Sequence, residues 1–194
     1  MLGNETMRYF LGFLVAIGLI ILVIILVVRA LGGGNHNQTA TPQTVLSDYA
    51  DTATVMRLSI DDNVNADENH YTVRINVGRD EKSVEVVKGY QGKVVSSQSF
   101  GNNQEAYTVF LRALEFQGYT KGDTDPAKAD ERGMCPTNRR YIYEIISPGG
   151  ADVQRLWNSE CKVGTFEGNG SVIRTLFREQ IPNYRTLVKG TGIS

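Results

Sequence analysis

Hydrophobic residues are distributed along the chain in two different patterns. The first is a single run, Tyr9 to Val28, in which twenty consecutive residues carry no charge. A helix of that length spans about 30 Å, the thickness of the hydrocarbon core of a bilayer. The run therefore predicts one transmembrane helix over residues 9–31, after a short cytoplasmic segment, 1–8. A cleaved signal peptide is the main alternative, but the run is longer than the usual apolar region of about 7 to 15 residues.

The second pattern begins after a polar stretch, residues 32–44, which is rich in Gly, Asn, Gln and Thr and predicts a flexible tether. Beyond it, apolar and polar residues alternate, as in half-buried strands. The predicted strands are Val55–Ile60, Tyr71–Val77, Ser83–Val87 and Lys93–Ser97. A helix is predicted from Asn102 to Gly118, because Asn is a favoured cap, apolar residues recur at helical spacing, and Gly is a common terminator.

The carboxy-terminal third repeats this order. Strands are predicted at Tyr141–Ile146, Val153–Trp157 and Lys162–Phe166, and a helix at Asn169–Ile181. Residues 45–194 therefore predict an α+β domain with an antiparallel sheet and two main helices packed on one face. The similar order of elements in 71–118 and 141–182 raises two interpretations, a duplicated β-β-(β)-α unit or a chance likeness.

The two cysteines, Cys135 and Cys161, both follow the apolar run. A hairpin turn centred on Gly149 and Gly150 places Cys161 opposite Asn138, three residues from Cys135. A modest bend of the polar loop 119–139 then brings the two sulfurs within bonding range. We predict a disulfide, which indicates an oxidising compartment outside the membrane. Two free thiols in a reducing compartment are the alternative.

Charge narrows the choice of partners. The chain has 20 Lys and Arg against 21 Asp and Glu, which argues against a nucleic-acid binder. The two halves differ, however, since residues 133–194 hold 8 basic and 5 acidic side chains and residues 35–132 hold 10 and 15. Arg139, Arg140 and Arg155 form a candidate patch for an anionic ligand, and an ordinary solvated face is the alternative.

No motif for catalysis, a cofactor or a metal stands out. The only histidine outside the tether is His70, and no G-x-S-x-G, phosphate-binding loop or H-E-x-x-H is present. Asp61, Asn63, Asn65 and Asp67 have the spacing of a calcium loop. Ala66 replaces the glycine that such a loop needs, and Thr72 replaces the bidentate glutamate, so a solvated turn is the better interpretation.

The expected protein is a single-pass membrane protein with its amino terminus in the cytoplasm, because Arg8 and the amino terminus, less Glu5, precede the apolar run and a lone Arg29 follows it. Its extracytoplasmic domain is expected to be a binding or assembly module that contacts the lipid bilayer and a protein partner of the envelope. One alternative is an envelope-acting hydrolase with unidentified carboxylates. Another is a subunit of a secretion, division or pilus machine, since the apolar helix, sheet domain and late disulfide resemble type IV pilins in architecture alone.

Overall fold

The computed structural model describes residues 45–193 of the chain. Its elements, in chain order, are η1 (Leu46–Tyr49), β1 (Val55–Asp61), η2 (Asp67–Asn69), β2 (Tyr71–Val77), β3 (Glu81–Lys88), β4 (Lys93–Gly101), α2 (Gln104–Phe116), η3 (Pro126–Lys128), β5 (Arg140–Ile146), β6 (Asp152–Ser159), α3 (Gly170–Glu179) and α4 (Tyr184–Leu187). The predicted transmembrane helix 9–31 and tether 32–44 lie outside these residues. Within them, no helix is long and apolar enough to cross a membrane.

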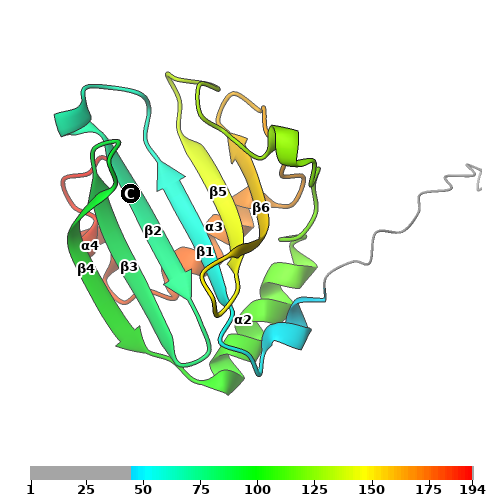
Figure 1. Ribbon diagram of the computed structural model, residues 1–194. Coiled ribbons are helices and arrows are strands. Elements are labelled where there is room, and N and C mark those ends of the chain that lie inside the picture. Colours follow the sequence, from blue (N-terminus) through cyan, green and yellow to red (C-terminus); the bar gives the residue numbers. More distant parts are fainter. Residues whose placement is uncertain (1–44, 194) are drawn as a thin grey trace, which may run out of the picture. The chain divides into compact units, whose positions relative to one another are not determined.

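One antiparallel sheet of six strands organises the fold, with the strand order β4-β3-β2-β1-β5-β6. The α2 and α3 helices lie on one face of this sheet (Figure 1). The predicted α+β class, with the two main helices on one face, is therefore confirmed for the described residues.

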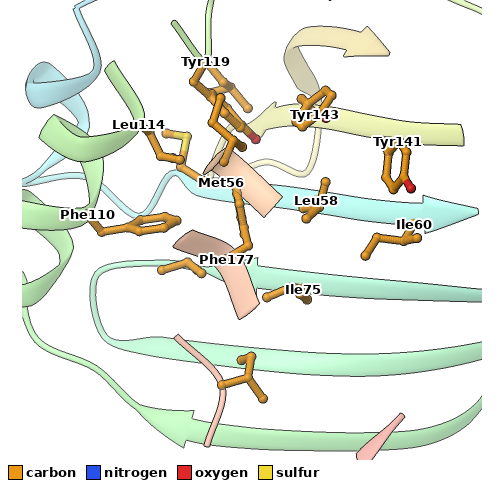
Figure 2. Close-up of a cluster of buried hydrophobic side chains, with 14 of the residues drawn as sticks. Met56, Leu58, Ile60, Ile75, Phe110, Leu114, Tyr119, Tyr141, Tyr143 and Phe177 are labelled. Atoms are coloured by element: carbon orange, nitrogen blue, oxygen red, sulfur yellow. The ribbon is translucent and has the colours of Figure 1, made fainter. Parts of the chain in front are cut away.

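The core lies between that face and the helices. Successive side chains of a strand point to opposite faces, so Met56, Leu58 and Ile60 of β1 all face the helices and are fully buried. Phe110 of α2 and Phe177 of α3 meet edge to face above them, with ring centroids 5.1 Å apart. Figure 2 shows these helical side chains against the side chains of β1, β2 and β5.

Tyr119, which follows α2, anchors the start of the long crossing loop 119–139. Its hydroxyl donates to the backbone oxygens of Arg57 (2.8 Å) and Glu144 (3.0 Å), and its ring is buried. Farther along the loop, the carbonyl of Lys128 accepts a hydrogen bond from the Trp157 indole at 2.8 Å. The loop therefore begins at the core and then covers part of the opposite face of the sheet.

Two elements differ from the sequence prediction. Asn103, one residue later than expected, caps α2 by accepting from the Ala106 amide at 2.9 Å. Asn102 instead donates its side-chain amide to the Gly78 carbonyl. The predicted strand Lys162–Phe166 is wrong, because that segment forms only isolated bridges at Gly164 and Phe166.

The arrangement of the two predicted repeats is informative. Their first strands, β2 and β5, both flank β1 and run in the same direction, while the remaining strands extend outward on opposite sides. A half-turn of one unit about the normal of the sheet would reverse its strands, whereas β2 and β5 run in the same direction. A half-turn about the strand axis would place its helix on the other face of the sheet, whereas α2 and α3 lie on the same face (Figure 1). No simple rotation therefore relates the units, and duplication remains a prediction.

Candidate functional site

The face of the sheet that is turned away from the helices is polar. It is built by the alternate strand positions that do not enter the core. In cross-strand register, these positions bring together Arg57, Ser59 and Asp61 of β1, Thr72 and Arg74 of β2, Arg140, Ile142 and Glu144 of β5, and Arg155 of β6. Hydrophobic alternation on one face thus forces a cluster of charges onto the other.

A cavity of about 590 Å³ lies over this polar face. Ser59, a small residue on the central strand β1, leaves the space between Arg74 and Ile142, its cross-strand neighbours. His70 and Tyr90 line one part of the wall, and residues 131–133 of the crossing loop line another. The cavity therefore has a rigid sheet floor and walls made by loops.

Arg140 is the most deeply buried charge of the floor, with its side chain 4% exposed. One terminal nitrogen donates to the Asp61 carboxylate and, at 3.2 Å, to the carbonyl of Asp62. Its Nε is buried and has no hydrogen-bond partner in the described structure. A buried donor without an acceptor is costly, so the described residues satisfy the Arg140 guanidinium only in part.

Arg155 connects the sheet to the crossing loop. It donates to the Glu131 carboxylate at 2.5 Å and to the carbonyl of Ala129, and its Nε lies 3.4 Å from the Glu144 carboxylate. Burial raises the pKa of Glu144, and the positive charge of Arg155 opposes that rise only in part. Glu131 and Glu144 are therefore held by one guanidinium.

Arg57 and Arg74 make no direct ion pair among the described residues, although Glu144 lies opposite Arg57 and Glu85 lies opposite Arg74 in the cross-strand register. Arg57 donates its Nε to the side-chain oxygen of Asn76 at 2.7 Å, which holds the guanidinium in place. Among residues 45–193, no carboxylate lies within 4 Å of a nitrogen of either guanidinium. The cavity lining has five arginines and three carboxylates, and one of the arginines, Arg132, is paired with Asp130 outside the lining, so an excess of one positive charge remains.

A fixed aromatic pair forms the wall near Asp61. The His70 ring is buried, 3.1 Å from Asp61 Oδ1, and stacks on the Tyr90 ring with centroids 4.2 Å apart and an angle of 17°. The Tyr90 hydroxyl accepts from the Asn65 amide (3.0 Å) and donates to the Asn65 carbonyl (2.8 Å). Asn65 and Asp67, two residues of the loop with calcium-like spacing, thus hold this aromatic pair in place. The Asp67 carboxylate accepts a hydrogen bond from the backbone amide of Tyr90.

The structure divides the predicted patch of arginines. Arg140 and Arg155 line the cavity together. Arg139, the neighbour of Arg140, lies outside the lining, 3.3 Å from the Asp62 carboxylate, and donates to the Gly192 carbonyl. Arg57 and Arg74 were not predicted as site residues. The only sign of them in the sequence is that they occupy polar positions in strands of alternating apolar and polar residues. The register between the strands must be known before these positions can be brought together.

The predicted cysteine pair closes the crossing loop behind this site. Cys135 and Cys161 lie at disulfide distance, with their Cα atoms 6.3 Å apart, inside the range that disulfides require. The predicted hairpin register is confirmed, because Arg140 pairs with Ser159 and Tyr143 with Leu156. The bond therefore links the strand β6 end of the sheet to the loop that carries Glu131.

The fold and the site together define a class of protein: a small α+β domain with an arginine-lined cavity on the polar face of its sheet. Comparison with models of protein families, with characterised proteins and with solved structures finds no match to this chain. The residues of the site are therefore the basis for assigning a function to this chain.

Proposed function

We propose that the chain is a membrane-anchored binding module whose extracytoplasmic domain holds an anionic ligand in the cavity of the sheet. The observation that carries the proposal is the excess of arginine in that cavity, with Arg57 and Arg74 free of ion pairs among the described residues. A guanidinium group matches carboxylate and phosphate groups with two parallel hydrogen bonds. The cavity volume is also typical of sites for small ligands.

A purely structural role explains the charges of the cavity less completely than ligand binding does. Asp61, Glu131 and Glu144 each have an arginine partner, as expected for buried ion pairs. Arg74 and the Nε of Arg140 remain without acceptors in the described structure. An incoming anion would supply an acceptor for Arg74, and it would offset the repulsion between neighbouring guanidinium groups.

The predicted anchor and tether determine where this binding would occur. An uncleaved helix over 9–31 would hold the domain at the lipid bilayer, and residues 32–44 would let it reach a ligand or a protein partner of the envelope. The cysteine pair supports an oxidising, extracytoplasmic location, since disulfides persist in such compartments.

The proposal can be tested by calorimetric titration of the full chain in detergent micelles with inorganic phosphate and with acetate. We expect binding of at least one of the two anions, weakened about 10- to 100-fold by Arg74→Gln, because a hydrogen bond to a charged group contributes roughly 1.5–3 kcal/mol. The matched control is Arg112→Gln, which removes an exposed arginine outside the cavity. Absence of binding, or equal affinity in the Arg74 variant and the unsubstituted chain, would refute an arginine-based site.

Hydrolysis of an envelope polymer is the second candidate. It is favoured by the three carboxylates of the cavity and by the burial that raises the pKa of Glu144, as a general acid requires. Binding remains the better proposal, because Glu131 and Glu144 both contact Arg155 and neither is free to act as a base. Release of reducing ends from envelope polysaccharide that is lost in Glu144→Gln would decide for the enzyme.

A further inference from the structure

Tyr90 is an exposed aromatic residue that is nevertheless held rigidly. It follows β3 in the turn before β4, is 52% exposed, and lines the cavity. Both polar ends of the residue are fixed: the hydroxyl makes two hydrogen bonds to the backbone of Asn65, and the amide donates to Asp67 at 2.7 Å. The ring orientation is thus set before any ligand arrives.

Among residues 45–193, the only aromatic ring that stacks on Tyr90 is that of His70. His70 stacks on one side of the ring, so the exposed area belongs to the other side and the edge. An exposed aromatic ring loses the hydrophobic gain of burial, and fixing it adds the entropy cost of an ordered side chain. A ligand that covers the ring gains the hydrophobic free energy of burial and does not pay the entropy cost of ordering the side chain, because the ring is already fixed. This is the advantage of a preorganised site.

The polar groups next to the ring limit what this ligand can be. Asp61, Glu131 and Glu144 offer carboxylate oxygens, Ser59 and Thr72 offer hydroxyls, and the arginines offer paired donors. Such a mixture of donors and acceptors matches a ring that bears several hydroxyl groups, each of which both donates and accepts. The apolar C–H face of a sugar ring, in turn, matches the flat surface of an aromatic side chain.

The net charge of the lining sets a further limit. An excess of one positive charge suits a ligand with one acidic group. A nucleoside polyphosphate would bring more negative charge than the cavity can balance and would place it beside three carboxylates. The volume of about 590 Å³ admits a small ligand or one end of a chain.

We propose that the cavity binds an acidic sugar unit, with the sugar ring stacked on Tyr90 and its carboxylate held by Arg74, the floor arginine that no ion pair or side-chain hydrogen bond occupies among the described residues. This inference rests on the anion site proposed above and names its ligand class. The sugar hydroxyls bind among Ser59, Thr72 and the carboxylates of the floor. The domain thereby recognises acidic polysaccharide at the cell surface.

The experiment is calorimetric titration of the full chain in micelles with disaccharides that contain glucuronic, galacturonic or N-acetylmuramic acid. Each disaccharide is compared with the neutral counterpart in which the carboxylate is reduced to an alcohol. We expect at least one acidic disaccharide to bind 10-fold or more tightly than its neutral counterpart and than acetate. Inorganic phosphate and adenosine monophosphate are titrated in parallel.

Substitution of the aromatic ring separates stacking from charge. Tyr90→Ala is expected to weaken binding of the acidic disaccharide about 10-fold while binding of phosphate or acetate is unchanged. Tyr90→Phe retains the ring and is expected to lose less. Phe116→Ala, which removes an aromatic residue that is 88% exposed on α2, is the matched control and is expected to change nothing.

The possible results separate the two proposals. If phosphate or acetate binds but every acidic disaccharide binds no tighter than its neutral counterpart, the sugar inference is wrong and the anion site stands. Tighter binding of adenosine monophosphate than of any disaccharide overturns the inference in favour of a nucleotide. If no probe binds, both proposals fail. The disaccharide comparison in the unsubstituted chain gives a decision even if Tyr90→Ala does not fold.

Discussion

At the scale of single residues, Glu144 shows how burial on the polar face changes the pKa of a carboxylate. Its side chain is 12% exposed and lies 3.4 Å from Arg155. Burial nevertheless raises its pKa above the ordinary value of 4.5, since loss of water around a carboxylate outweighs the attraction of the nearby arginines. The folded protein therefore holds this proton to a higher pH than the unfolded chain does.

The sign of the resulting pH dependence follows directly. Between pH 4.5 and the raised pKa, the folded state binds more protons at this position than the unfolded state, so its contribution to the unfolding free energy falls as the pH rises. We expect the unfolding free energy of the unsubstituted protein, measured relative to Glu144→Gln by urea titration, to decrease from pH 4 to pH 7. Glu167→Gln, on the exposed surface, is the control for the effect of a Glu-to-Gln substitution outside the cavity. A flat difference for Glu144→Gln would contradict the assignment.

The neighbours Arg139 and Arg140 illustrate what sequence reasoning can reach at this scale. Both belong to the basic and aromatic segment that the sequence singles out. Adjacent residues in extended chain point to opposite sides, so Arg140 enters the cavity while Arg139 contacts Asp62 and Gly192. The pattern identified the segment, and only the position of the sheet decided which arginine lines the site.

At the scale of elements, alternation and turn residues predicted most strands well. The hairpin of β5 and β6 has the predicted register, which is why the cysteine pairing could be derived from the turn at Gly149 and Gly150. Short-range patterns fail where tertiary contacts decide. The segment 162–166 runs past the edge of β6 and makes bridges instead of a strand.

The disulfide gives a prediction for the crossing loop. It closes a loop of 26 residues, so its loss through Cys161→Ser is expected to lower the unfolding free energy by about 2–4 kcal/mol. Since the loop supplies Glu131 and Arg132 to the cavity, the variant should also bind the anionic probe more weakly. Denaturant titration and calorimetry measure the two effects. Ser97→Ala, on the exposed strand β4, serves as the control variant, and unchanged stability of Cys161→Ser would show that the bond does not form.

At the scale of the whole molecule, the predicted anchor would place the cavity at the membrane, on its extracytoplasmic side. We expect the chain to remain with membranes after carbonate extraction, and a form that lacks residues 1–44 to be released. In sealed cells, a membrane-impermeant maleimide is expected to label Cys135 and Cys161 only after a reductant is added. Labelling without a reductant would contradict the disulfide, and protection of both thiols in reduced, sealed cells but not in lysed cells would contradict the extracytoplasmic location.

The sequence by itself determined the α+β class, the side of each strand that enters the core, and the cysteine pair, because these depend on alternation and on distances along a hairpin. The tertiary structure alone decided the site. Arg57, Arg74, Arg140 and Arg155 come from four strands, and only the register between strands places them on one floor. The physical reason is that the alternation of apolar and polar residues within one strand determines which of its side chains are buried, whereas a cavity depends on how separate strands are aligned.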